Sequence, residues 1–264
     1  MISIRIYNQN RVLQTAQLPS SWVDISVKKR RQLLQIAVSL PYPYNFHNII
    51  LKLLNVKEST LRQIPPEQLQ ALYEKMHWMV NDPVEDPIFP SFRHGMTRYY
   101  YPKGKLWNAT GLEYALADEY YTHFVEEGDE KSLLHLAATL IRPQDRKKKG
   151  AEREDDPRIA LKSRAQVELA AKKFHKMPAE TIHAAFLLFI GCKNWVYNTY
   201  GQFIFEESGT SKKDPFGWYG TFFTLSEMGA FGTVNEVQHE NFHTICQFLM
   251  KRKMDEPKQK PKTS

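Results

Sequence analysis

The chain has 264 residues, of which 42% are hydrophobic and 12% aromatic, and this excludes an intrinsically disordered protein. The formal net charge is +7, but residues 251–264 hold six basic and two acidic side chains, so only +3 remains for the rest of the chain. A nucleic-acid-binding domain usually concentrates positive charge on a folded face, so this distribution argues against one.

The two cysteines, Cys192 and Cys246, stand far apart and form no C-x-x-C motif. This usage predicts buried free thiols in a reducing compartment rather than a disulfide framework. The longest apolar stretch, residues 182–192, is shorter than the roughly 20 residues that a membrane-spanning helix needs. No apolar run of signal-peptide length opens the sequence. We therefore expect a soluble, intracellular protein.

The N-terminal region predicts a short hairpin followed by short helices. Ile2, Ile4 and Ile6 alternate with polar residues, and a turn at residues 8–10 leads to a returning strand at 12–16. Ser26 can cap the first helix, whose basic run at residues 28–31 is typical of a solvated face. Helices also follow the proline break at residues 41–43 and start again at residue 66.

Residues 82–94 contain three prolines and no period, which predicts a loop, and residues 97–101 predict a strand. The tyrosine triplet at 99–101 could stack on nucleic-acid bases, but no RNP-like pattern accompanies it. A strand without a binding role is the preferred interpretation.

The helical core is expected to assemble around two helices in series between Thr110 and Arg142. Thr110 and Glu113 form a T-x-x-E capping box, after which apolar residues recur every fourth position. Gly128 is expected to end the first helix and Asp129 to cap the second.

Residues 144–158 hold six basic and five acidic side chains and no large apolar one. Such a segment cannot bury enough apolar surface to offset its ordering entropy, so we expect a mobile, solvated loop. Its basic run is a candidate contact for an acidic partner and comprises Arg146, Lys147, Lys148 and Lys149.

The C-terminal part predicts three helices. Pro178 opens the most apolar one, which should be central, and His183 on it is interpreted as a hydrogen-bonded histidine rather than a ligand. A polar loop is expected at 206–215. The next helix carries a candidate contact surface or a core-packing stripe, formed by Trp218, Tyr219 and Phe222. A second capping box at Thr233 and Glu236 begins a last helix, which should run to about residue 251.

His239, Glu240 and His243 fit the H-E-x-x-H pattern of zinc peptidases. Two histidines four positions apart on one helix can share a zinc ion while the glutamate activates its bound water. However, no good third ligand follows, and on a continuous helix both histidines would point away from the apolar stripe toward solvent. The pattern is retained only as an alternative.

Three segments appear in a recognisable order. Residues 18–26 read LPSSWVDIS, residues 116–121 read LADEYY and are followed by LLHLAATLIRP at 133–143, and residues 217–219 read GWY before LSEMGAFG at 225–232. Together they resemble a poorly characterised family found in tailed phages and prophages of Bacteroides-like bacteria. In such phages this kind of gene lies among tail genes, near the tape-measure gene. The resemblance implies a tail-associated structural role or one like that of a tail assembly chaperone, and it transfers no catalytic residue.

These observations predict a mainly α protein with a helical bundle-like core and a small N-terminal β-hairpin. The expected division is an N-terminal lobe (1–105), a helical core lobe (106–252) and a disordered basic tail (253–264). We expect no catalysis, cofactor or metal. The expected partners are phage tail proteins, the tape-measure protein first among them, or further copies of the chain, in the cytoplasm of the bacterial host or in the virion. The open alternatives are the zinc hydrolase and a nucleic-acid-binding accessory protein that uses the tail and the Lys147 loop.

Overall fold

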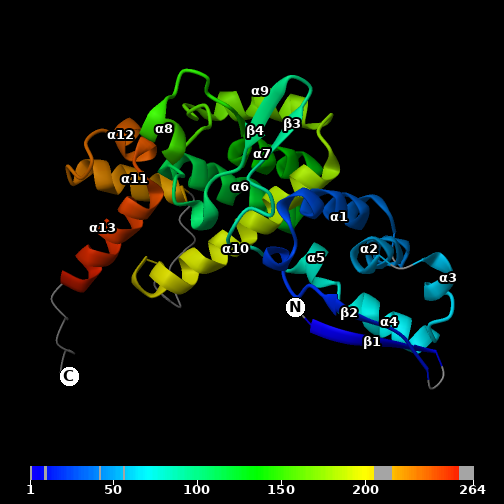
Figure 1. Cartoon of the computed structure of the whole chain (residues 1–264). Coiled ribbons are helices and arrows are strands. Elements are labelled where there is room, and N and C mark those ends of the chain that lie inside the picture. Colours follow the sequence, from blue (N-terminus) through cyan, green and yellow to red (C-terminus); the bar gives the residue numbers. More distant parts are fainter. Residues whose placement is uncertain (1, 9–10, 42, 56, 205–215, 256–264) are drawn as a thin grey trace, which may run out of the picture.

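A computed structural model describes residues 2–8, 11–41, 43–55, 57–204 and 216–255 of the chain. Helices dominate these residues, which confirms the mainly α fold class (Figure 1). The longest helix, α10 (Ala179–Ile204), crosses the molecule, with the elements before residue 82 toward one end and those after residue 216 toward the other (Figure 1). The polar loop expected at 206–215 lies outside the described residues.

The N-terminal strands β1 (Ile2–Asn8) and β2 (Arg11–Leu18) pair antiparallel and form the hairpin that the isoleucine alternation predicts. A short 3-10 turn and five helices follow: η1 (Trp22–Asp24), α1 (Val27–Ser39), α2 (Tyr44–Leu54), α3 (Glu58–Leu61), α4 (Pro66–Glu74) and α5 (Trp78–Asn81). They pack their apolar faces together, and α1 also packs on α10.

The expected helix pair is present as α6 (Gly111–Glu127) and α7 (Glu130–Leu140). The Thr110 side chain accepts a hydrogen bond from the Glu113 backbone, Gly128 adopts a left-handed φ of 69°, and Asp129 caps α7. Only half of the first capping box forms, because the Glu113 side chain turns to two arginines instead of returning to the helix start.

A small antiparallel sheet lies beside this pair in the order β3 (Ser91–His94), β4 (Thr97–Tyr100), β5 (Arg142–Pro143). The strand predicted at 97–101 is therefore confirmed. The segment 82–94, expected to be loop, contributes β3 at its end. The 3-10 turn η2 (Gly104–Leu106) connects β4 to α6.

Most of the segment 144–158 is exposed, as its composition predicts, but the segment is not loop throughout and one of its charges is buried. It contains α8 (Gly150–Asp155), and the Arg158 side chain is 0% exposed. The Arg158 guanidinium donates hydrogen bonds to the carboxylates of Glu113 and Asp156 and to the Leu140 carbonyl. Arg142 joins the same cluster through a 2.6 Å bond to Glu113. Buried charges that are paired in this way hold the segment against α6 and α7.

Helix α9 (Arg164–Phe174) leads into α10, which is the central helix that the sequence predicts. His183 on α10 lies 2.9 Å from the Val80 carbonyl through Nε2, as expected of a hydrogen-bonded helix histidine. Cys192 and Cys246 are buried and free, which confirms that part of the cysteine prediction.

The C-terminal region forms α11 (Trp218–Glu227), α12 (Val234–His239) and α13 (Phe242–Asp255). The second capping box, of Thr233 and Glu236, is complete. The prediction of one helix from Thr233 to about residue 251 is wrong, because the chain becomes extended at Glu240 (φ −67°, ψ 154°). The amide oxygen of Asn241 then accepts from the backbone of His243 and caps a new helix.

The main hydrophobic core includes residues from both expected lobes, such as Leu34 and Leu188, and a smaller core cluster lies between α6 and the last three helices. The division at residue 105 remains a prediction. Residues 253–255, assigned to a disordered tail, belong to α13, whereas residues 256–264 lie outside the described part of the chain.

Candidate functional site

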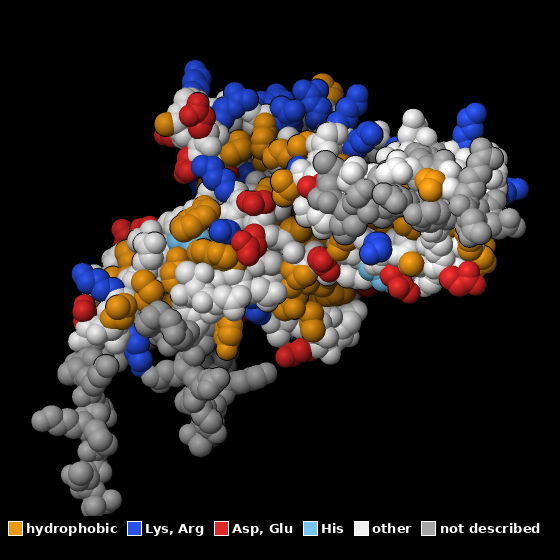
Figure 2. Space-filling model, turned by 60° about the horizontal axis from the view of Figure 1, so that its bottom comes forward, with side chains coloured by type: hydrophobic (Ala, Val, Ile, Leu, Met, Phe, Trp, Pro, Cys, Tyr) orange, Lys and Arg blue, Asp and Glu red, His pale blue; other side chains and the backbone are white. Residues whose placement is uncertain are grey.

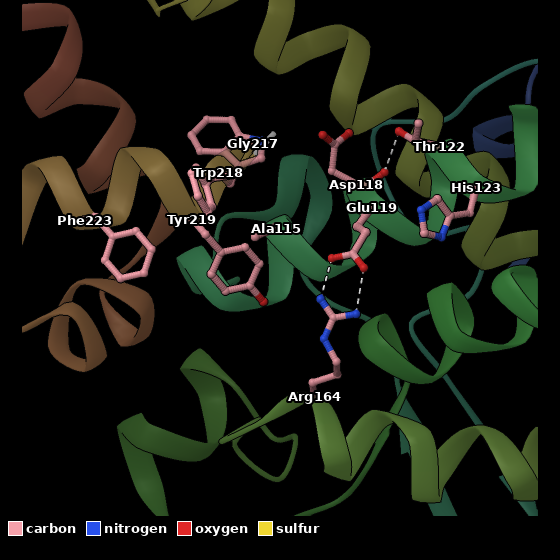
Figure 3. Close-up of a pocket in the computed structure, with 11 residues that line it drawn as sticks. Ala115, Asp118, Glu119, Thr122, His123, Arg164, Gly217, Trp218, Tyr219 and Phe223 are labelled. Carbon is pink, nitrogen blue, oxygen red and sulfur yellow. Dashed lines mark hydrogen bonds and ion pairs between the residues drawn. The ribbon is translucent and has the colours of Figure 1, made fainter. Parts of the chain in front are cut away.

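A cavity of about 650 Å³ opens between α6, the first residue of α9 and the start of α11 (Figure 3). Helix α6 contributes one wall, and the region of α11 contributes the other. The lining residues are Ala115, Asp118, Glu119, Thr122, His123, Arg164, Phe216, Gly217, Trp218, Tyr219 and Phe223. We call this cavity the α6–α11 groove. Its volume is in the range of cavities that accept several side chains or a small ligand.

The α6 wall carries charges that are already arranged by partners. Glu119 accepts two parallel hydrogen bonds from Arg164, at 2.7 and 2.5 Å, which is the bidentate geometry that orders both side chains. The hydrogen bonds that Arg164 donates to Glu119 raise the pKa of Arg164 above its usual value, although desolvation acts against them. Asp118 pairs with Lys193 of α10. The carboxylates of both Asp118 and Glu119 are therefore paired, and their charges are held in place on this wall.

The α11 wall is aromatic. Trp218 meets the rings of Tyr114 and Phe242 edge-on, with centroids 5.3 and 5.2 Å apart, so the core holds its position. Phe223 is less constrained, because 46% of its surface is exposed. Gly217, with φ 50° and ψ −130°, occupies a conformation that few other residues adopt and starts α11 at the groove. The groove thus sets an aromatic wall, held in place at Trp218, against a wall whose charged side chains are paired.

Two of the three predicted contact residues of this helix, Trp218 and Tyr219, line the groove, and the third does not. Phe222 is 0% exposed and belongs to the smaller core cluster, as the core-packing interpretation holds. In the basic run, Arg146, Lys147 and Lys149 are exposed. Lys148 turns inward and donates to the carbonyls of Asp156 and Arg158. The structure therefore separates the predicted contact residues into two different surfaces.

The zinc alternative required two histidines on one helix, and the structure contradicts this premise. Helix α12 ends at His239, α13 begins at Phe242, and His243 is only 2% exposed, so the expectation that it faces solvent is wrong. Its Nε2 donates to the Lys105 carbonyl at 2.7 Å, and its Nδ1 accepts from the Tyr200 hydroxyl at 3.2 Å. Burial lowers the pKa of His243, against the effect of the bond to Lys105. Both ring nitrogens are thus engaged inside the protein.

Within the described ranges, no three His, Cys, Asp or Glu side chains are grouped so that they could hold a metal ion. Nor does any helix in those ranges combine the length and the hydrophobicity needed to cross a membrane.

The sequence predicted only Trp218 and Tyr219 among the groove residues, and the charged residues of the wall, Asp118, Glu119 and Arg164, were not identified. Glu119 and Arg164 stand 45 positions apart, and their pairing depends on how α9 returns to α6. The adjacent acids Asp118 and Glu119 are visible in the sequence because they interrupt the apolar stripe of α6, but the sequence does not show which residues pair with them.

Comparison of the chain with protein-family models, with curated proteins and with solved structures gave no match.

Proposed function

We propose that this protein acts by binding another protein, and that the α6–α11 groove receives apolar side chains of an amphipathic helix on the partner. The observation that carries the proposal is the aromatic wall beside an open cavity of about 650 Å³. Helix-in-groove recognition uses such a wall to take up residues spaced three or four positions apart on the partner. The fixed charges of Glu119 and Arg164 on the opposite wall suit the polar face of the same helix.

We further propose that the partner belongs to a phage or prophage tail. This part of the proposal is supported by the ordered resemblance of the three sequence segments, and the groove supplies a means of binding. Long tail proteins expose helical apolar surface before they assemble, and a groove of this kind can cover part of it. The role would be that of an assembly factor or adaptor, without catalysis.

The test is co-expression with the tape-measure protein of the same phage or prophage, followed by purification through a tag on that partner. Phe223→Ser removes a half-exposed aromatic side chain from the groove wall without opening the core. Leu169→Ser is the matched control, because Leu169 is 63% exposed on α9 and does not line the groove. We expect the wild type and the control to co-purify with the partner and Phe223→Ser to be lost.

Equal recovery of Phe223→Ser and the control would remove the groove from the proposal. Absence of any co-purification, together with no gain in solubility of the tape-measure protein, would count against the tail role itself. Sedimentation of the protein alone then distinguishes self-association, since a concentration-dependent oligomer broken by Phe223→Ser would mean that a second copy fills the groove.

A further inference from the structure

The β3–β4 hairpin places two arginines directly opposite each other. Arg93 and Arg98 are cross-strand partners, and both are exposed. Like charges in this position repel each other and destabilise the strand pair. Neither arginine forms an ion pair with any residue that the structure describes, although Arg98 lies over the Tyr100 ring at 5.8 Å. The fold therefore keeps an unfavourable charge pair on its surface.

Two aromatic residues of the hairpin point the other way. Phe92 and Tyr99 form the neighbouring cross-strand pair, and their rings stack with centroids 5.5 Å apart and an interplanar angle of 12°. Tyr101 is buried and its hydroxyl donates to the Thr181 carbonyl. These side chains serve the core. Of the tyrosine triplet only Tyr100 shares the face of the arginines, and a single ring does not make the stacking platform that single-stranded nucleic acid uses.

The same aromatic pair brings the end of α9 to the hairpin. Tyr99 meets the Phe174 ring edge-on at 6.4 Å. Three exposed lysines lie within two residues of Phe174: Lys172, Lys173 and Lys176. Lysines in a last helical turn are favoured by the helix dipole in any protein. That effect accounts for Lys172 and Lys173, which lie in the last turn of α9, but not for Lys176, which follows the helix.

The turn after β5 extends this surface. The Gln144 backbone donates to the Arg98 carbonyl at 2.9 Å, so the turn starts beside β4. Arg146, Lys147 and Lys149 follow and are exposed. The predicted basic contact run therefore adjoins the arginine pair.

The hairpin and the end of α9, residues 91–100 and 170–177, together hold five Lys and Arg residues and no Asp or Glu. The net charge of these two segments, +5, is larger than the +3 of the whole chain before residue 251, because acidic side chains elsewhere in the chain offset it. Figure 2 shows a row of Lys and Arg side chains along the upper edge of the molecule. We call the five residues Arg93, Arg98, Lys172, Lys173 and Lys176 the basic face.

From this surface we propose a second activity: the basic face binds the phosphate backbone of duplex DNA without reading its sequence. Guanidinium groups bind phosphate through paired hydrogen bonds, and an anionic backbone relieves the repulsion between Arg93 and Arg98. The centre of a protein–protein interface is poor in charge and rich in aromatic side chains. Here the exposed side chains are cationic, and the apolar Met96 stands alone at the hairpin tip, 95% exposed. The surface therefore suits DNA better than an acidic protein.

The test is fluorescence anisotropy of the full chain with a labelled duplex of mixed sequence, at several salt concentrations. The basic face alone, with five phosphate contacts, predicts a binding constant that falls about 500-fold between about 50 and 200 mM salt. In Arg93→Gln/Arg98→Gln the fall should shrink to about 40-fold, because two contacts are removed. The control is Lys52→Gln/Lys75→Gln, which removes the same charge from exposed positions on α2 and after α4 and should match the wild type.

A chain that ends at Asp255 identifies the contribution of the basic tail. Binding that survives this truncation and weakens in Arg93→Gln/Arg98→Gln supports the proposal. Binding that disappears on truncation and ignores the hairpin variant overturns it and leaves the tail as the source. Equal affinity for poly-glutamate and the duplex also overturns it, in favour of an acidic protein partner. The hairpin variant relieves a like-charge contact, so its urea midpoint should be no lower than that of the wild type.

Discussion

Replacing Glu113 by Gln should destabilise the protein far more than the same change at Glu119, although both glutamates lie on α6. Glu113 is 2% exposed and receives hydrogen bonds from Arg142 at 2.6 Å and from Arg158 at 3.1 Å. Its loss leaves two buried guanidinium groups with one carboxylate, that of Asp156, between them. Breaking a buried charge pair from one side costs about 3 to 5 kcal/mol.

The glutamine keeps one acceptor oxygen but turns an amide donor toward a guanidinium, so we expect a loss of about 3 kcal/mol. The Glu119–Arg164 pair is 32% and 40% exposed, and Glu119→Gln should cost about 1 kcal/mol or less. Urea unfolding followed by tryptophan fluorescence gives both values, because the chain contains five tryptophans. A loss in Glu113→Gln no greater than that in Glu119→Gln would refute the assignment of the buried cluster as the anchor of residues 144–158.

Three further outcomes follow from other parts of the structure. The charge and hydrogen bonds of Arg158 lower the pKa of Asp156 even though burial alone would raise it. The ionised Asp156 therefore stabilises the fold above about pH 4, and this stabilisation is lost below that pH. Urea midpoints from pH 7 to 3 should fall less in Asp156→Asn than in the wild type. The pKa of His243 is lowered by burial, so the fold favours the neutral ring and loses stability as pH falls below about 6.5; the same series should show a flatter profile in His243→Gln between pH 7 and 5. Gly191→Ala should lower the free energy of unfolding by at least about 1 to 3 kcal/mol, because the added Cβ would overlap the backbone of the loop before β3. Gly201→Ala on the same helix is the control, because its Cβ meets only a tyrosine ring at 3.2 Å, and it should change the melting temperature little.

Elements with local signals were predictable from the sequence. Asp129 caps α7 with its own side chain, and Gly128 supplies the left-handed residue that ends α6. These interactions span three or four residues, so the sequence contains all their partners. The same holds for the complete capping box at Thr233.

Elements that depend on distant partners were not. Residues 144–158 look solvated by composition, yet Arg158 is buried because Glu113, 45 positions earlier, supplies its counter-charge. Composition cannot distinguish a charge that faces water from one that faces a partner. The Glu119–Arg164 pair of the groove escaped prediction for the same reason.

The break before α13 is a different case, because its signal was present and was outweighed. Asn241 is a good helix N-cap, and its side chain accepts from the backbone of His243 and Thr244. The capping box at Thr233 and the apolar residues after it favoured one continuous helix instead. A capping residue inside an H-E-x-x-H pattern indicates that a helix can begin within the pattern, so that its two histidines need not lie on one helix.

The two cysteines can report how often the packing around the central helix opens. Cys192 lies on α10 and Cys246 on α13, and these helices pack against each other. Burial raises the pKa of Cys192 to about 12 and that of Cys246 still further, so neither forms a reactive thiolate in the closed protein. A thiol reagent can therefore react only after the packing over one of the thiols opens, which for Cys192 includes the loop whose Glu85 carbonyl its Sγ contacts at 3.5 Å. Its labelling rate at neutral pH measures how often this opening occurs, without any engineered reporter in the chain.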